Sequence, residues 1–153
     1  MELILWRHAE AEDPAPGQDD LQRALTARGE QQAARMAQWL DCRLPEGVLI
    51  LCSPALRCEQ TVAVLGRKYE SRAALAPVSD AQQLLREAGW PGSKQPVLLV
   101  GHQPTLGQAV SSLLGLADAD SPFRKGAVWW LRGRERARRH QAVVVTVQSP
   151  ELL

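Results

Sequence analysis

The amino-acid sequence predicts an α/β protein, a three-layer αβα sandwich in which a mostly parallel sheet lies between two layers of helices. Three short, mainly apolar segments, at 3–6, 48–52 and 96–102, have the pattern of strands that are buried on both faces. A segment with apolar residues at helical spacing follows each of them, and this alternation is typical of parallel sheets. Because no internal repeat or low-complexity linker interrupts the pattern, residues 1–153 are expected to form one domain.

Start signals indicate where the helices begin. Thr26 has the side chain of an N-cap, and Ser53-Pro54 combines an N-cap serine with a proline at the first helical position. The predicted helices are 27–40, 53–66, 80–87 (capped by Ser79 or Asp80) and 104–114. The other predicted strands are a short one at 73–77 and a last pair at 127–131 and 142–147, joined by a charged connection.

The composition is that of an ordinary soluble protein, with 45% apolar and 23% charged residues. A net charge of +1 creates no overall field that would favour nucleic acid or a membrane surface as a partner. No apolar run approaches the roughly 20 residues that a transmembrane helix needs, and the chain does not begin like a signal peptide. The three cysteines show no metal-ligand spacing, so we expect free thiols and a cytoplasmic location.

Polar residues follow three of the predicted strands. Arg7 and His8 come directly after the first strand, Arg57 lies in the first turn after the second, and His102 follows the third. Because the carboxyl ends of parallel strands meet at one edge of a sheet, these four side chains are expected to converge. The amino termini of the neighbouring helices add positive potential at the same edge.

Two guanidinium groups and two imidazoles around one point suit a phosphate dianion, which an arginine can hold with a two-pronged hydrogen bond. His8 is also a nucleophile when its ring is neutral. We therefore predict phosphoryl transfer, which depends on placement and charge stabilisation, with no metal and no other cofactor. A zinc site is the competing interpretation, but no carboxylate or thiolate stands at ligand spacing. A third interpretation assigns these four residues no function and treats them as solvated polar side chains at the ends of strands.

The motifs around these residues resemble those of the histidine phosphatase superfamily, whose fold is called phosphoglycerate-mutase-like. Arg7-His8-Ala9 resembles its Arg-His-Gly signature, and residues 53–61 (SPALRCEQT) are similar to its Ser-Pro-x-x-Arg-x-x-x-Thr motif. Residues 101–104 (GHQP) resemble Gly-His-x-Pro, and residues 23–29 (RALTARG) resemble Arg-Pro-Leu-Thr-x-x-Gly. The motifs occur in the family's order, and the compact length is most similar to SixA-type phosphohistidine phosphatases.

The resemblance implies that His8 is the nucleophile that becomes phosphorylated, and that Arg7, Arg57 and His102 form the phosphate pocket. It adds Arg23 as a candidate substrate-binding residue. Two positions depart from the motifs, since Ala9 replaces glycine and alanine replaces the proline that would follow Arg23. Alanine at position 9 is compatible with the motif if its backbone φ is negative.

Larger members of the family have an acidic proton donor, and Asp80 and Glu87 are the carboxylates in the corresponding region of this chain. Asp80 is the better-placed candidate general acid, although a role as a helix N-cap explains it equally well. SixA-type members resemble this chain in lacking an obvious donor. An imidazole leaves a phosphoramidate more readily than an alkoxide leaves an ester, so a phosphohistidine substrate needs less help from an acid.

The expected function is hydrolysis of phosphohistidine on a protein in signalling, with a phosphorylated histidine-carrier or phosphotransfer domain as the partner. The alternatives are a phosphatase for a small phosphomonoester and a non-catalytic phosphohistidine-binding module, which would not require His8. A mutase is disfavoured because a short chain has little material for a closed pocket. The arginine-rich stretch 132–139 is either a solvated hairpin or a docking surface for an acidic phosphoprotein. No oligomeric state follows from the sequence.

Overall fold

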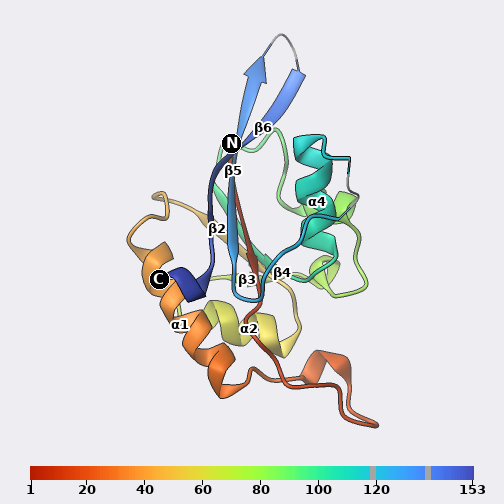
Figure 1. The fold of residues 1–153 in the computed structure, drawn as a ribbon. Helices are drawn as coiled ribbons and strands as arrows, with labels where there is room; N and C mark the ends of the chain where they lie inside the picture. The colour runs from red at the N-terminus through yellow and green to blue at the C-terminus, as the bar shows by residue number, and fades with distance from the viewer. Residues whose placement is uncertain (118–119, 137–138) are drawn as a thin grey trace.

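The structure is a computed structural model that describes residues 1–117, 120–136 and 139–153 (Figure 1). Its sheet has six strands in the order β3-β2-β4-β1-β5-β6. The strands are β1 (Glu2–Arg7), β2 (Leu49–Cys52), β3 (Glu70–Ser71), β4 (Val97–Gly101), β5 (Val128–Arg136) and β6 (Arg139–Gln148). The first four are parallel, whereas β5 is antiparallel to β1 and β6 is antiparallel to β5. The predicted mostly parallel sheet is therefore confirmed.

Helices cover both faces of this sheet, as the three-layer prediction requires. The helices α1 (Ala27–Asp41) and α2 (Leu56–Ala63) pack on one face, and α3 (Ala81–Glu87) and α4 (Thr105–Leu114) pack on the other. Short 3-10 helices, η1 (Asp20–Gln22), η2 (Ala73–Leu75) and η3 (Pro150–Leu152), occur in the connections. Within the described residues, none of the helices combines the length and the apolar character that a bilayer crossing requires.

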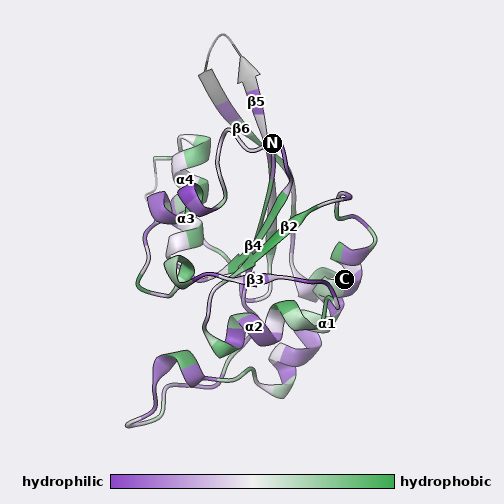
Figure 2. Ribbon diagram, turned by 180° about the vertical axis from the view of Figure 1, so that it is seen from behind, coloured by the Kyte–Doolittle hydropathy of each residue, from purple (hydrophilic) through white to green (hydrophobic). Residues whose placement is uncertain are grey.

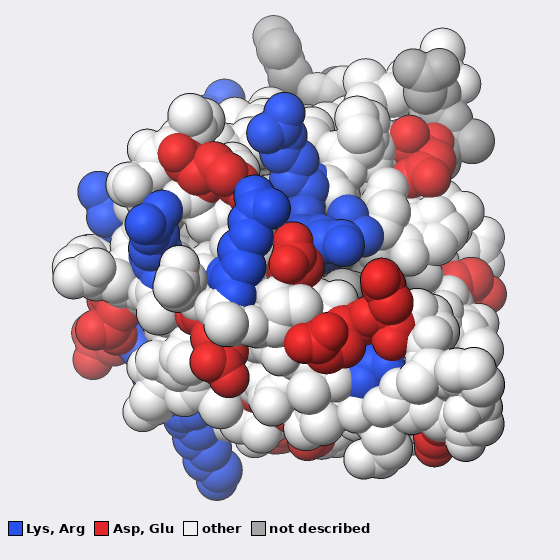
Figure 3. All heavy atoms as spheres, turned by 60° about the horizontal axis from the view of Figure 1, so that its bottom comes forward, with Lys and Arg blue, Asp and Glu red and all other residues white. Residues whose placement is uncertain are grey.

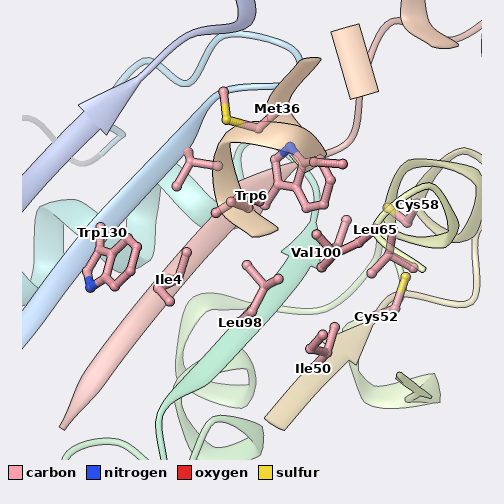
Figure 4. Close-up of a cluster of buried hydrophobic side chains, with 14 residues drawn as sticks. Ile4, Trp6, Met36, Ile50, Cys52, Cys58, Leu65, Leu98, Val100 and Trp130 are labelled. Carbon is pink, nitrogen blue, oxygen red and sulfur yellow. The ribbon is translucent and has the colours of Figure 1, made fainter. Parts of the chain in front are cut away.

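The sheet has a hydrophobic core on each face, and the side chains of β1 contribute alternately to the two cores. Ile4 and Trp6 of β1 point toward α1 and α2, whereas Leu3 and Leu5 point toward α3 and α4. All four side chains are completely buried, which explains why residues 3–6 form a continuous apolar run. The parallel strands β2 and β4 of the same sheet are drawn in green, the colour of hydrophobic residues, in Figure 2. Figure 4 shows the first core, where Trp6 of β1 lies beside Met36 of α1, and Leu98 and Val100 of β4 belong to the same cluster.

The register of the sheet sets the positions of the strand ends. Arg7 at the end of β1 lies opposite Gly101 at the end of β4. The chain continues this pairing beyond the strands, because the amide of His8 donates to the carbonyl of Gly101 and the amide of Ser53 donates to the carbonyl of Val100, both at 3.1 Å. The residues that follow β1, β2 and β4 therefore meet at the lower end of the molecule in Figure 1.

Two predicted helix starts are confirmed by their caps. The hydroxyl of Thr26 accepts a hydrogen bond from the amide of Gly29 at 3.0 Å, and the carboxylate of Asp80 accepts one from the amide of Gln83 at 2.8 Å. The start of α2 differs from the prediction, because this helix begins at Leu56 and Ser53 is not its cap. The hydroxyl of Ser53 instead lies 2.7 Å from Nε2 of His102, so the serine serves the pocket described below.

Two strand predictions were also wrong in part. Residues 73–77 contain the 3-10 helix η2 in place of a strand, and the short strand β3 lies just before them. The charged connection after residue 131 continues as β5 and β6, which extend past the amino end of β1 as a hairpin (Figure 1). Arg132 pairs with Glu2 there, at the end of the sheet opposite His8. Arg138 lies outside the described residues.

Candidate active site

A pocket of about 230 Å³ lies beyond the carboxyl ends of β1 and β4. Segments that are far apart in the sequence line it, through Arg7, His8, Ala11, Arg23, Arg57, Pro77, His102, Gln103 and Lys125. Figure 3 views the molecule from this end and shows Lys and Arg side chains close together, with acidic side chains among them. The structure thus brings the four residues that follow the predicted strands into one cavity and adds Arg23 to its wall.

His8 is held in one orientation by its own backbone. Its Nδ1 lies 2.7 Å from the carbonyl oxygen of Ala9, which can only accept, so Nδ1 carries the proton and Nε2 keeps its lone pair. Burial lowers the pKa of His8 to about 3; the bond to Ala9 opposes this shift, and the positive charges of Arg57, Arg7 and Arg23 add to it. The ring is therefore neutral near pH 7, which is the nucleophilic form.

His102 is bonded on both sides of its ring. Its Nδ1 lies 3.4 Å from Nη2 of Arg57, which can only donate, so Nδ1 accepts and Nε2 donates to the hydroxyl of Ser53. Burial lowers the pKa of His102 to about 3, helped by its proximity to His8 and Arg57. The thiol of Cys58 lies 3.5 Å from the same Nε2, but burial raises the pKa of this thiol to about 12, so it stays protonated.

The two arginines that follow the strands line the pocket, and each keeps one buried donor without a partner. Arg7 donates from Nη1 to the carbonyl of Phe123, and Arg57 donates from Nη1 and Nη2 to Asp20. The Nε atoms of both arginines are buried and have no hydrogen-bond partner. A buried donor without a partner costs on the order of 1–3 kcal/mol. The guanidinium groups border the pocket and provide positive charge for an oxyanion bound there. The arrangement therefore suits a bound phosphoryl group.

Thr61 links the segment that follows Arg7 to the helix that carries Arg57. Its hydroxyl accepts a hydrogen bond from the amide of Ala9 at 3.1 Å and donates one to the carbonyl of Arg57 at 2.6 Å. The residue after His8 is thereby fixed to the first turns of α2. This contact explains why a threonine stands four residues after the arginine in the motif.

Asp20, in the 3-10 helix η1, was not among the site residues predicted from the sequence. Asp20 forms ion pairs with Arg57 and Arg23, at 3.0 and 2.9 Å. Asp120 was missed as well: its Oδ1 accepts from Nε2 of Gln103, a pocket-lining residue, at 2.6 Å. Asp20 belongs to this short helix and Asp120 to the connection between α4 and β5, and no motif or spacing marks either residue.

The candidate general acid lies elsewhere. The carboxylate of Asp80 caps α3, and neither Asp80 nor Glu87 lines the pocket. Glu87 accepts a hydrogen bond from Gln83 at 3.0 Å. Within residues 1–117, 120–136 and 139–153, no group of three or more His, Cys, Asp and Glu side chains has an arrangement that could hold a metal ion.

Comparisons with known proteins identify the family of this chain. The sequence profile of the histidine phosphatase superfamily (branch 1) matches residues 3–84. The phosphohistidine phosphatase SixA homolog of Haemophilus influenzae is 29% identical over 163 aligned residues, which cover 93% of this chain and 96% of that protein.

Solved structures of SixA proteins share the fold. The SixA phosphohistidine phosphatase of Nakamurella multipartitia superposes with a TM-score of 0.78 at 29% identity, covering 97% of this chain and 95% of that one. The protein histidine phosphatase SixA complexed with tungstate superposes with a TM-score of 0.81 at 25% identity, covering 99% of each chain. Because the profile spans more than half of the sequence and the likeness to SixA proteins spans nearly all of it, the chain belongs to the histidine phosphatase superfamily (branch 1) and is a phosphatase.

Proposed function

We propose that this phosphatase hydrolyses phosphohistidine on a protein, through a covalent phosphohistidine intermediate on His8. The observation that carries the proposal is the bond from Nδ1 of His8 to the carbonyl of Ala9, which leaves the lone pair of a neutral Nε2 for attack. Arg7, Arg57 and His102 surround the same pocket and would hold the phosphoryl oxygens.

In the first step, Nε2 of His8 forms a bond to phosphorus while the phosphorus–nitrogen bond of the substrate breaks. The electron pair of that bond stays on the substrate's imidazole, which leaves as a neutral ring if its other nitrogen arrives protonated. In the second step, water attacks phosphorus and the bond to Nε2 breaks, which returns the electron pair to His8 and releases phosphate. Phosphoryl transfer of this kind depends on positioning and charge stabilisation, which the two arginines would supply.

The leaving group favours phosphohistidine over an alkyl phosphate. An alkoxide needs a proton in the transition state, whereas a protonated phosphoimidazole does not. No aspartate or glutamate is among the described residues that line the pocket, and Asp80 is engaged as a helix cap. The SixA relatives, which carry the name phosphohistidine phosphatase, support the same substrate class.

The deciding experiment is a comparison of kcat/KM on a panel of substrates, measured with a chelator present. The panel contains phosphohistidine peptides, phosphorylated histidine-carrier domains, p-nitrophenyl phosphate and a simple sugar phosphate. We expect phosphohistidine, and the ester with the acidic phenol, to react much faster than the sugar phosphate. His8→Ala protein, prepared in the same way, controls for contaminating phosphatases.

A ratio of one or less between phosphohistidine protein and sugar phosphate would overturn the substrate assignment in favour of a phosphatase for small phosphomonoesters. Binding of phosphohistidine without turnover would identify a non-catalytic module. Activity that disappears with the chelator and returns with zinc or magnesium would contradict a mechanism that relies on arginine charge.

A further inference from the structure

One carboxylate outside the motifs contacts two arginines of the pocket. Oδ2 of Asp20 accepts a hydrogen bond from Nη2 of Arg57 at 3.0 Å, and Oδ1 accepts one from Nε of Arg23 at 2.9 Å. The backbone carbonyl of Asp20 accepts a further bond from Nη1 of Arg57 at 2.8 Å. A single residue therefore satisfies both terminal nitrogens of Arg57.

This double contact fixes the plane of a buried guanidinium. The side chain of Arg57 is only 4% exposed, and its Nε has no partner. Its Nη2 also lies 3.4 Å from Nδ1 of His102, so this part of the guanidinium borders the pocket. Because a guanidinium is planar and its five donors have fixed directions, two bonds to Asp20 determine where the remaining donors point.

The segment that carries Asp20 is anchored to the same helix as Arg57. Leu25, which closes the loop by pairing with Ala11, donates its amide to the side chain of Gln60 in α2 at 2.7 Å. Next to this pairing, Arg23 donates a hydrogen bond to the carbonyl of Glu12 at 2.7 Å and links the same two stretches of chain. The acceptors of Asp20 are therefore held in place relative to α2.

We propose that Asp20 is a positioning residue that sets the orientation of the Arg57 guanidinium for phosphoryl transfer, without touching the phosphoryl group itself. The proposal rests on the proposed function in one respect, since it takes Arg57 to bind the phosphoryl oxygens. Asp20 does not line the pocket, and its side chain is 51% exposed. A role through Arg57 therefore fits its location better than direct contact with substrate.

Asp20 remains ionised over the whole neutral range. Desolvation would raise the pKa of its carboxyl group, but the hydrogen bonds from Arg23 and Arg57 and their charges outweigh this effect and lower it. A negative charge beside the pocket opposes the binding of a dianion. Asp20 is therefore expected to support turnover through geometry while it weakens the binding of free phosphate.

The test compares Asp20→Ala, which removes both side-chain acceptors, with Asp20→Asn, which keeps an oxygen that can accept from Arg57. Asp13→Ala is the matched control, because it removes the same charge from the same exposed segment. We expect kcat to fall on the order of 10- to 100-fold in Asp20→Ala, the range that a misplaced active-site group produces. The dissociation constant for inorganic phosphate, measured by calorimetry, is expected to stay unchanged or decrease.

The asparagine variant separates geometry from charge. We expect Asp20→Asn to retain kcat within a few-fold of wild type, and Asp13→Ala to match wild type. If Asp20→Asn loses as much turnover as Asp20→Ala, the charge is the important property and the positioning role is wrong. A loss of phosphate affinity that parallels the loss of kcat would contradict the proposal too, because it would indicate general damage to the pocket.

A double-mutant cycle tests whether Asp20 acts through Arg57. In an Arg57→Met background, which keeps much of the packing of the stem, Asp20→Ala should cause no further loss of turnover. An additive loss would show that Asp20 acts on something other than Arg57.

A measurement without substrate tests the positioning role of Asp20 independently of the substrate assignment. Hydrogen exchange of the Arg57 guanidinium, followed by NMR, should be slow in wild type and at least several-fold faster in Asp20→Ala. If wild type hydrolyses no phosphohistidine, the substrate assignment fails, while the exchange rates still decide whether Asp20 holds Arg57. Equal exchange in both proteins would overturn the positioning role even in an active enzyme.

Discussion

The imidazole rings of His8 and His102 lie with their centroids 5.3 Å apart and their planes tilted by 56°. Burial lowers the pKa of each ring to about 3, and the other ring and the arginines nearby disfavour a positive charge further for His102. The pair is therefore neutral at physiological pH. His8 consequently needs no separate base to remove a proton before it attacks phosphorus.

Acid should destabilise the protein because of this pair. In the unfolded chain each histidine takes up a proton near its ordinary pKa of 6.5, whereas the folded protein resists protonation until about pH 3. The stabilising contribution is thus complete above pH 6.5 and is lost as the pH falls toward 3. The free energy of unfolding should decrease by about 1.4 kcal/mol per pH unit for each histidine below pH 6. Urea denaturation at several pH values measures this decrease. In His8→Gln, the free energy of unfolding should depend less steeply on pH. An equally steep dependence in the variant would show that His8 does not contribute.

Removal of the proposed nucleophile should abolish turnover. His8→Ala is expected to lose several orders of magnitude in kcat, as enzymes do when a nucleophile is removed. In wild type, reaction with a labelled phosphoryl donor followed by rapid denaturation should leave acid-labile phosphate on His8, detected by mass spectrometry. Substantial turnover in the alanine variant, or label on another residue, would exclude the proposed role.

Lysine should not replace Arg57. A lysine ammonium lacks the planar fork that bonds Asp20 at one side and leaves donors at the other, so we expect at least a 100-fold loss of kcat/KM with the fold retained. Arg67→Lys is the control, since Arg67 forms a surface ion pair with Asp41. Wild-type kinetics in Arg57→Lys would mean that Arg57 does not bind the phosphoryl group.

Substitutions at Asp80 can separate its capping role from a role as a general acid. Asp80→Ala should lower the free energy of unfolding by about 0.5–2 kcal/mol, because it removes the cap of α3. Asp80→Asn keeps a capping oxygen and should leave both stability and phosphohistidine turnover close to wild type. A large loss of turnover in a stable Asp80→Asn protein would instead support Asp80 as the general acid.

A glycine in α1 is required by close packing against the segment that follows His8. A Cβ atom at Gly29 would lie 1.9 Å from the carbonyl oxygen of Glu10, so the helix or this segment would have to move. Gly29→Ala should destabilise the protein by about 1–3 kcal/mol and lower turnover, because the shift begins two residues from the nucleophile. Gly92→Ala, at a position with open space around it, is the control for the change in thermal unfolding. Equal stability of the two variants would contradict this explanation.

The sheet and the clustering of Arg7, His8, Arg57 and His102 were predictable from the sequence. Strands buried on both faces are continuously apolar, and the carboxyl ends of parallel strands fall at one edge, so the position of a residue after its strand determines its place. The caps at Thr26 and Asp80 were predictable because each bonds an amide only three positions further along the chain.

Ser53, Asp20 and the last two strands show where local patterns are insufficient. Ser53 has the sequence of a helix cap, but a tertiary partner, His102, takes its hydroxyl, and α2 starts three residues later. Asp20 gains its role from Arg57, a residue 37 positions away in the sequence. Residues 132–136 carry several charges, which suggested a loop, yet an antiparallel pair can leave one face in water, and Arg132 and Arg134 are exposed.

The hairpin of β5 and β6 and the pocket lie at opposite ends of β1. The six residues of β1 span about 20 Å, because a strand rises about 3.3 Å per residue. A label, a tether or a solid support attached at the hairpin would therefore stand well clear of His8 and leave the pocket facing outward. This separation makes the hairpin a suitable attachment point for single-molecule or surface-based measurements of ligand binding at the pocket.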